Sequence, residues 1–426
     1  MTSSILIGAI ADDLTGATDL ALMLARNGMK TVQVIGVPVE GADFGDAEAV
    51  VIALKSRTIA ADDAVAMALA SAMALQAAGA EQFLFKYCST FDSTPAGNIG
   101  PVAEALMDFL DVPIAVACPA FPAAGRSIYQ GHLFVGSTLL SDSPMRDHPL
   151  TPMRDANLVR VLQAQSTSRV GLIPLDIVSA GPDAIKAVMT RAQQAGFRLM
   201  IADVVRDADL RILGEALASA RLITGGSGIA MGLPENFRRK DRIGTAPVPE
   251  RMAAPLGRSV VLAGSCSAAT RSQVQVAIDA GCPALRVIPI DIVSGVQTVA
   301  DIANWVLSQS DKEPALIYSS DEPEAVLAVQ EKLGRDAAGL LVEQLMGNLA
   351  VVLRDNGFSR FVVAGGETAG AVVSALGVQA LEIGPEIAPG VPWTRSISGP
   401  DLALALKSGN FGAPDFFLKA WDLLDD

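Results

Sequence analysis

The sequence predicts an α/β protein of two domains, each a mostly parallel sheet flanked by helices, with the active site expected in a cleft between them. Three observations support this prediction. The chain has 426 residues, more than the roughly 100–200 that one domain usually holds. Half of the residues are apolar but only 5% are aromatic, which suits buried parallel strands covered by Ala-rich helices. Short β-rich runs also alternate with helical periodicity, as in parallel sheets.

In the first half, eight short apolar runs bounded by turn residues are predicted as strands. The first helix is expected over residues 15–27, because Leu20, Met23 and Leu24 share one face and Gly28 offers a left-handed stop. The predicted strands are 5–10, 31–37, 49–54, 82–87, 113–118, 170–174, 198–204 and 222–224.

A polar, proline-bearing stretch over residues 236–258 lacks apolar periodicity and is predicted to be the linker. The expected domains are therefore 1–235, which would bind the substrate, and 259–426. A second α/β series follows the linker, and its predicted strands are 259–263, 285–290, 315–318, 360–363 and 380–383.

Charge and cysteine usage narrow the class of partner. Lys and Arg number 32 against 46 Asp and Glu, a net charge of −14, which disfavours nucleic acid and anionic membranes and favours a small-molecule ligand. The four cysteines form no CxxC pair, so neither a zinc site nor a disulfide framework is indicated. Residues 64–80 are apolar but shorter than the roughly 20 needed to span a bilayer, and no export signal is visible. We expect a cytoplasmic protein.

Two adjacent carboxylates, Asp12 and Asp13, follow the first predicted strand. Ligands bind at the carboxyl edge of open α/β sheets, so one of the two is a candidate general base or a ligand of polyol hydroxyls. The structural alternative is that Asp13 caps the next helix and Asp12 binds loop amides.

Cations follow the next strands of the predicted sheet. Arg57 lies after the third strand and Lys86 at the end of the fourth, where Ser89, Asp92 and Ser93 add hydroxyl and carboxylate groups. Such groups suit a ligand with a carboxylate and several hydroxyls. Each residue taken alone could equally be a solvated loop side chain.

Both histidines, His132 and His148, fall in one proline-rich charged segment over residues 125–153, which could close over a pocket. The alternative is that each is structural, and two histidines without a third ligand do not indicate a metal site.

Three glycine-bearing turns in the second half are typical of a phosphate site. They contain Ser265, then Gly365, Gly366, Glu367 and Thr368, and finally Gly409 beside Lys407. Tight packing is the alternative explanation for each small residue. No Gly-Lys dipeptide occurs, so a Walker A loop is absent.

Three motifs, ADDLTG at 11–16, AGGETAG at 364–370 and KSGNFG at 407–412, resemble those of the four-carbon acid sugar kinases, over essentially the whole chain. The resemblance implies a sugar-acid domain followed by an ATP domain, and transfer of the γ-phosphoryl group to a terminal hydroxyl with Mg²⁺ on the ATP phosphates and no dedicated metal motif. It places Asp12 or Asp13, Arg57 and the 86–93 segment on the sugar acid. Ser265, the turn 365–368 and Gly409 would bind ATP.

Residues 86–94 replace the Lys-x-Asp-Ser-Thr-x-Arg-Gly motif of threonate and erythronate kinases, and together with residues 143–149 they resemble the 3-oxo-tetronate (3-dehydrotetronate) kinase branch, which phosphorylates O4. We expect Arg57 and Lys86 to hold the carboxylate while Asp12 or Asp13 orients or deprotonates the hydroxyl. Open alternatives are a threonate or erythronate 4-kinase, a sugar-phosphate aldolase or isomerase, and a sugar-acid sensor without turnover. The sequence leaves the oligomeric state open, a homodimer included.

Overall fold

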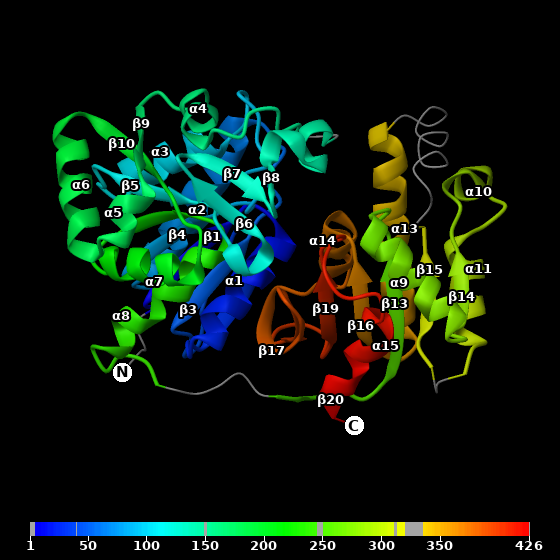
Figure 1. Ribbon diagram of the computed structural model, residues 1–426. Coiled ribbons are helices and arrows are strands. Elements are labelled where there is room, and N and C mark those ends of the chain that lie inside the picture. Colours follow the sequence, from blue (N-terminus) through cyan, green and yellow to red (C-terminus); the bar gives the residue numbers. More distant parts are fainter. Residues whose placement is uncertain are drawn as a thin grey trace. The chain divides into compact units, whose positions relative to one another are not determined.

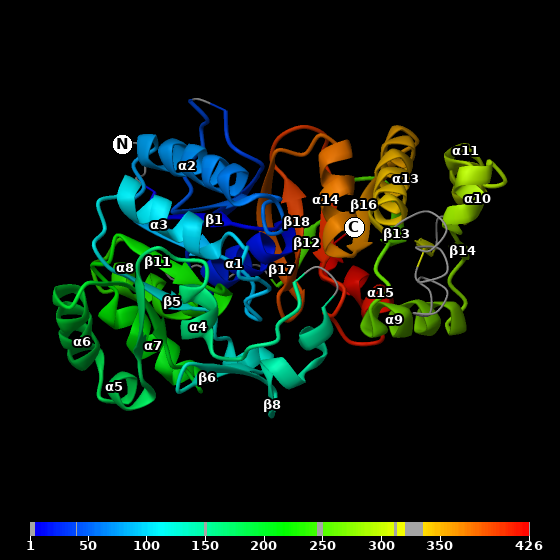
Figure 2. The same ribbon diagram turned by 90° about the horizontal axis from the view of Figure 1, so that it is seen from above.

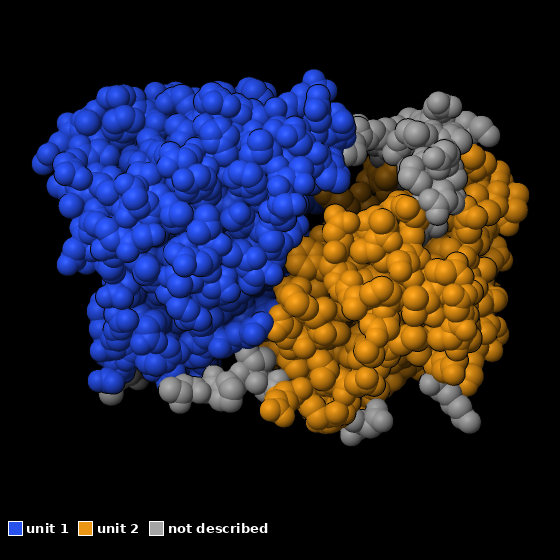
Figure 3. Space-filling view, in the orientation of Figure 1, with its two compact units in different colours: residues 1–247 blue, residues 248–426 orange. Residues whose placement is uncertain are grey.

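The computed structural model describes residues 5–39, 41–148, 151–244, 250–310, 313–319 and 335–425. The chain divides into two compact units, Met1–Pro247 and Val248–Asp426, coloured separately in Figure 3. The α/β class predicted from the sequence is confirmed in both units.

Unit 1 is built on eight parallel strands in the order β2-β3-β1-β4-β11-β5-β10-β9. This order puts β3, β1 and β4 side by side, so their carboxyl ends share one edge. The strands are β1 Ile7–Ala11, β2 Thr31–Ile35, β3 Ala49–Ala53, β4 Gln82–Lys86, β5 Ala115–Cys118, β9 Arg169–Ile173, β10 Phe197–Ala202 and β11 Leu222–Gly225.

Helices cover both faces of this sheet. Helix α2 packs on α3, whereas α1 packs on η4, which contacts α7; Figure 2 shows α2 and α3 on one side of the strands and α6 and α7 on the other. These elements are α1 Leu14–Arg26, α2 Ala61–Ala77, α3 Ile99–Phe109, α4 Leu158–Gln163, α5 Leu175–Ser179, α6 Pro182–Gln194, α7 Asp207–Ala216, η4 Ser227–Gly232 and α8 Pro234–Arg238.

A small antiparallel sheet follows β5 and was not predicted. It comprises β6 Arg126–Tyr129, β7 His132–Val135 and β8 Thr138–Leu139, followed by the 3₁₀ turns η2 Leu140–Asp142 and η3 Pro144–Asp147. The fully buried carboxylate of Asp203 accepts the N–H groups of Gln130 and Gly131, each at 2.8 Å, and so fixes the β6–β7 turn.

Unit 2 is built on seven strands in the order β14-β15-β13-β16-β19-β18-β17, of which the first five are parallel and β18 is antiparallel to both neighbours. Figure 1 shows β14, β15, β13, β16 and β19 in this order. Helices α11 and α14 pack on α13, and α15 packs on α9. The elements are β13 Arg258–Ala263, β14 Ala284–Arg286, β15 Ala315–Tyr318, β16 Phe358–Ala364, β17 Ala380–Ala388, β18 Val391–Ser396, β19 Ala403–Lys407, α9 Ala268–Asp279, α10 Pro289–Ser294, α11 Val299–Leu307, α13 Arg335–Asp355, α14 Gly366–Ala375, α15 Phe416–Lys419 and η5 Ala420–Leu423.

The elements of unit 2 and the linker differ from the sequence-based expectations in three respects. The predicted strand 285–290 is wrong beyond Arg286, because Pro289 begins α10; strands β18 and β19 were not predicted. The predicted linker 236–258 is too long at both ends, because α8 reaches Arg238 and β12 Met252–Ala253 pairs with β20 Leu424–Asp425. Its residues 245–249 lie outside the described part of the chain. Among the described helices none is both long and apolar enough to cross a membrane.

Candidate active site

The carboxyl ends of β1, β3 and β4 bring three of the predicted site residues together. The N–H group of Asp12 donates to the carbonyl of Lys86 at 3.0 Å, and the N–H group of Arg57 donates to the carbonyl of Asp12 at 3.2 Å. Arg57 lies 45 positions after Asp12 in the sequence and Lys86 lies 74 positions after it, so it is the strand order that makes them neighbours.

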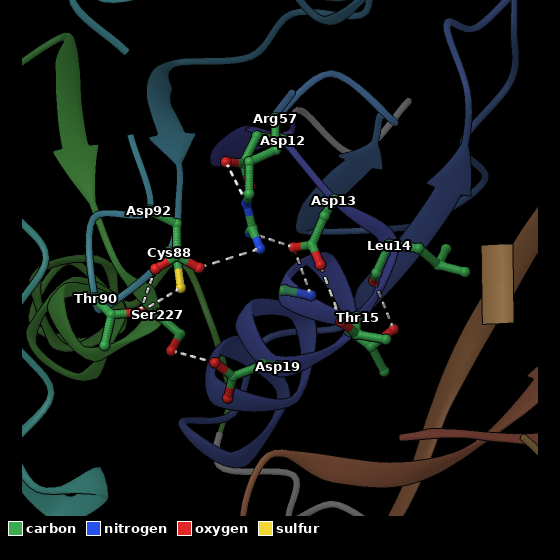
Figure 4. Close-up of polar contacts among 12 residues, drawn as sticks. Asp12, Asp13, Leu14, Thr15, Asp19, Arg57, Cys88, Thr90, Asp92 and Ser227 are labelled. Atoms are coloured by element: carbon green, nitrogen blue, oxygen red, sulfur yellow. Dashed lines mark hydrogen bonds and ion pairs between the residues drawn. The ribbon is translucent and has the colours of Figure 1, made fainter. Parts of the chain in front are cut away.

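Arg57 lies among carboxylates of the protein itself (Figure 4). Its Nε and Nη2 donate to the two carboxylate oxygens of Asp12 at 2.9 and 2.7 Å, and Nη2 also donates to Asp13 Oδ1 at 2.7 Å. Its Nη1 lies 3.9 Å from Asp92 Oδ2. The guanidinium fork that we expected to grip a substrate carboxylate is therefore occupied, so Arg57 orders three carboxylates in this arrangement.

Asp13 caps helix α1, so the structural alternative holds for this residue. Its Oδ1 accepts the N–H of Gly16 and its Oδ2 accepts the hydroxyl of Thr15, both at 3.0 Å. The Asp13 side chain is nevertheless 24% exposed, whereas that of Asp12 is 4% exposed. Of the two carboxylates, Asp13 is the one that a ligand can reach.

The two carboxyl groups differ in acidity. Burial raises the pKa of Asp12 above its ordinary value, even though Arg57 opposes the shift. Burial also acts on Asp13, but the charges of Arg57 and Lys86 outweigh it and hold the pKa of Asp13 below its ordinary value. Asp13 is thus the more firmly ionised group.

Lys86 is the available cation of this edge. Its side chain is buried, and within the described part of the chain its ammonium makes no hydrogen bond or ion pair, although its charge acts on Asp12 and Asp13. The Nζ atom lies 2.9 Å from the position that a Cβ on Gly16 would occupy, so the absence of a side chain there makes room for it. A buried ammonium without an ion pair is costly unless an anion binds it. The half-buried hydroxyl of Ser89 likewise has no partner among the described residues.

The connection after β4 has a strained backbone. Phe91 and Asp92 have φ angles of 66° and 39°, in the left-handed region that costs a non-glycine residue about 1–2 kcal/mol. The Phe91 ring is buried against Tyr87, with centroids 5.5 Å apart, and Asp92 Oδ1 accepts the hydroxyl of Thr90 at 2.6 Å. The bend aims Asp92 at Arg57.

Ser93 has a structural role that the sequence did not indicate. It is buried, and its Oγ accepts a hydrogen bond from Gln165 Nε2 at 2.9 Å. The Ser93 oxygen therefore has a partner within the protein, and its contact with the substrate stays a prediction.

Both histidines have partners within their own segment. His132 Nδ1 lies 2.8 Å from the Gln130 carbonyl, and His148 Nδ1 accepts the N–H of Thr151 at 3.2 Å. Pro149, part of the segment that carries the family resemblance, lies outside the described residues. The described ranges contain no group of three His, Cys, Asp or Glu side chains placed to hold a metal.

In unit 2 the three predicted glycine turns converge at the ends of the adjacent strands β13, β16 and β19. A Cβ on Gly264 would lie 2.1 Å from Thr368 Oγ1, and one on Gly409 would lie 2.4 Å from Ser265 Oγ. The N–H of Gly365 donates to the carbonyl of Lys407 at 2.8 Å. The predicted residues of all three turns thus lie together, with Gly366 and the exposed Glu367 opening α14 beside them.

Three fully buried polar residues hold these turns by hydrogen bonds: Lys407, Thr270 and Gln273. Lys407 Nζ donates to Thr270 Oγ1 at 3.1 Å and to the Gly409 carbonyl at 2.9 Å. Burial lowers the pKa of Lys407 to about 7. Sequence analysis identified only Lys407, by its charge, and missed Thr270 and Gln273. The pattern that could have indicated them is two polar residues three positions apart on the buried face of a helix.

Fold and site together define a class: a two-unit α/β protein with carboxylates and cations gathered at one sheet edge of the first unit and converging glycine turns in the second. Family comparisons agree, since a sugar-binding N-terminal domain matches residues 7–233 and a nucleotide-binding C-terminal domain matches residues 260–417. The chain belongs to the four-carbon acid sugar kinase family, as its three motifs predicted, and to the group of the 3-oxo-tetronate kinases, as residues 86–94 and 143–149 predicted.

Individual relatives match over almost their whole length. A protein of Cupriavidus necator named 3-oxo-tetronate kinase is 56% identical over 97% of this chain and 96% of its own, and one of Burkholderia multivorans with the same name is 54% identical over 99% and 97%. A crystal structure from Salmonella typhimurium LT2, described as a tRNA synthase, is 44% identical, with a TM-score of 0.86 over 98% of both chains. A Haemophilus influenzae structure of the same domain family is 38% identical, with a TM-score of 0.79 over 98% and 99%.

Proposed function

We propose that this protein is an ATP-dependent kinase that phosphorylates the O4 hydroxyl of 3-oxo-tetronate. The observation that carries the proposal is the buried ammonium of Lys86, which has no ion pair among the described residues, beside the accessible carboxylate of Asp13 at one sheet edge. This pairing offers an anion anchor next to a hydroxyl acceptor, as a sugar acid requires. The names of the curated relatives support the same substrate.

In this proposal the carboxylate of the substrate binds Lys86, and Ser89 binds one of its oxygens. Asp13 accepts a hydrogen bond from the O4 hydroxyl and orients this hydroxyl for attack. Phosphoryl transfer depends mainly on positioning and on charge stabilisation, so a carboxylate of low pKa is sufficient to orient the hydroxyl. Arg57 keeps Asp13, Asp12 and Asp92 in place without touching the substrate.

The converging glycine turns of unit 2 supply backbone amides for the ATP phosphates. Mg²⁺ typically keeps several waters and is held by phosphates with one or two carboxylates. The exposed carboxylate of Glu367, in the first turn of α14, suits that role, and the described residues offer no cluster that would hold the ion without nucleotide. When bound, the ion neutralises phosphate charge. ATP use also favours the cytoplasm as the compartment.

Other activities fit less well. A sugar-phosphate aldolase or isomerase has no use for a nucleotide-binding domain, which the family comparison assigns to residues 260–417. A tRNA synthase must bind a polyanion, and a net charge of −14 opposes this. A threonate or erythronate 4-kinase remains the nearest alternative, because it differs only at C3 of the substrate.

The test is ATP-dependent ADP release with 3-oxo-tetronate, threonate and erythronate, each as both enantiomers, followed by ³¹P NMR of the product. We expect the highest kcat/KM with a 3-oxo-tetronate and a phosphorus signal split by the two C4 protons. A higher kcat/KM with threonate or erythronate would favour the alternative kinase. Binding of sugar acid without ADP release would instead indicate a sensor.

A further inference from the structure

The loop after β19, residues 408–413, is attached to the protein through its carbonyl groups. The Gly409 carbonyl accepts three hydrogen bonds, from Ser267 Oγ at 2.6 Å, Thr270 Oγ1 at 2.9 Å and Lys407 Nζ at 2.9 Å. Gln273 Nε2 donates to the carbonyls of Phe411, Gly412 and Ala413 at 3.0, 3.0 and 3.1 Å.

The three donors from α9 form one face of that helix. Ser267 is its N-cap, and Thr270 and Gln273 follow at intervals of three, so their side chains lie in a row. Thr270 and Gln273 are fully buried. Burying an amide and a hydroxyl is favourable only when they are hydrogen-bonded, and their partners are mostly carbonyls of this single loop.

The direction of the carbonyl groups sets the direction of the amides. In a trans peptide, C=O and the N–H that follows point in opposite directions, and the described chain has no cis peptide. The N–H groups of Asn410, Gly412 and Ala413 therefore face away from α9. None of the three has a hydrogen-bond partner in the described part of the chain, whereas the Phe411 N–H donates to the Ser408 carbonyl at 3.1 Å.

We infer that Thr270, Gln273 and Lys407 are positioning residues for the nucleotide: they hold the carbonyls of loop 408–413 and thereby turn three free amides toward the phosphate groups. The inference rests on the proposed ATP-dependent activity and adds the residues that orient its phosphate site. Several convergent amides bind an anion, and the adjacent contact of Gly409 with Ser265 places them beside the turns described above.

Lys407 adds charge to this geometry. Among the described residues its ammonium donates to neutral oxygens alone, those of Thr270, Ser408 and Gly409. A buried cation whose charge is not cancelled creates a positive potential on the outer side of the loop. Burial lowers the pKa of Lys407 to about 7, so a bound phosphate would favour the charged form.

The unsubstituted chain gives the first test, by hydrogen–deuterium exchange at amide resolution. Saturating ADP should slow exchange at Asn410, Gly412 and Ala413 about tenfold, and adenosine, which lacks phosphate, should not. Unchanged exchange while calorimetry shows ADP bound, or equal slowing by adenosine, would overturn the inference alone. Failure of ADP to bind at all would overturn the proposed function as well.

Matched variants give the second test. Thr270→Val and Gln273→Met each remove donors to the loop, and we expect the Kd of ADP to rise roughly threefold to tenfold, the worth of about one hydrogen bond. Thr270→Ser, which keeps the hydroxyl, and Gln275→Met, on the exposed face of α9, should stay within about twofold of the natural chain.

The Kd of the sugar acid separates positioning from general loss of structure. It should be unchanged in all four variants, because α9 lies in unit 2. A parallel rise in both Kd values, or an unchanged Kd of ADP in both Thr270→Val and Gln273→Met, would contradict the inference. If one variant does not fold, the exchange measurement on the natural chain still tests whether the three amides bind phosphate.

Discussion

Asp12 and Asp13 are adjacent in the chain but have different surroundings. Asp12 is enclosed and holds the Arg57 guanidinium with both oxygens, whereas Asp13 caps α1 and stays accessible. Sequence reasoning left open which of them serves the chemistry. Their environments favour Asp12 as the structural partner and Asp13 as the group that contacts substrate.

Substitution by asparagine should separate the two roles. In Asp13→Asn the amide oxygen still caps α1 but the ion pair with Arg57 is lost, so the free energy of unfolding should fall by about 1–2 kcal/mol, while kcat falls roughly 100-fold or more. Asp12→Asn breaks a buried ion pair and should cost about 3 kcal/mol of unfolding free energy. Calorimetry and steady-state kinetics would measure both. Equal effects of the two substitutions on kcat and stability would contradict this assignment.

Lys86 gives a second prediction. Because its buried ammonium makes no ion pair in the described chain, Lys86→Met should leave the unfolding temperature unchanged or raise it. The KM of the sugar acid should rise roughly 10-fold to 100-fold through loss of a charge-assisted hydrogen bond, with the KM of ATP unchanged. A lower unfolding temperature with an unchanged KM of the sugar acid would show that Lys86 is structural.

Lys407 predicts a pH dependence of stability. Its pKa is about 7 in the folded chain and 10.5 ordinarily, so between these values the unfolded chain binds more protons. The contribution of Lys407 to stability therefore rises as pH increases from about 7 toward 10.5, and it is constant below that window. The free energy of unfolding of the natural chain minus that of Lys407→Met should therefore increase as the pH rises over this range.

Tryptophan fluorescence can follow the effect, because all three tryptophans, Trp305, Trp393 and Trp421, lie in unit 2. Denaturant unfolding without nucleotide at several pH values from 6.5 to 9.5 would suffice. A difference that stays constant over this range would mean that Lys407 keeps its proton.

At the scale of elements, the site in unit 2 depends on the close approach of two strand-to-helix turns. The turn after β13 and the turn after β16 meet where Gly264 faces Thr368, since a Cβ there would lie 2.1 Å from the threonine hydroxyl. Glycine is required at position 264 because there is no space for a side chain.

A double-mutant cycle tests that contact. Gly264→Ala alone should cost about 1–3 kcal/mol of unfolding free energy through overpacking. Adding Thr368→Ala removes the obstructing atoms, so the double variant should be more stable than the sum of the single effects predicts, by about 1 kcal/mol. The fluorescence of the same tryptophans would report it. Additive effects would show that the two turns do not touch.

Elements differ in how well the sequence predicts them. Strands such as β2, β3 and β4 were predicted to within two residues, because each is a β-branched or aromatic run bounded by turn residues. Strand β19 was not predicted, since Ala403–Lys407 alternates Ala and Leu and is buried throughout, a pattern that does not distinguish strand from helix. Strands β6 to β8 were missed because their pairing lies within a segment rich in Gly, Ser and charge.

For the whole molecule, the family comparison assigns sugar binding to the first half and nucleotide binding to the second. Each ligand should therefore act mainly within its own unit. A four-carbon sugar acid alone should slow hydrogen exchange at the ends of β1, β3 and β4, and ADP alone should slow it in the turns after β13, β16 and β19. Slowing of the second set by the sugar acid alone would contradict this division of roles.

The amino-acid sequence by itself determined the α/β class, the family and most of the candidate residues, because hydrophobic periodicity and short motifs are local properties of the chain. Only the tertiary structure decided which partners each of these residues has. Arg57 is occupied by Asp12 and Asp13, Ser93 is bonded to Gln165, and Lys86 has no ion pair in the described chain. The physical reason is that a side chain's role depends on partners far away in sequence, which strand order brings within hydrogen-bonding distance.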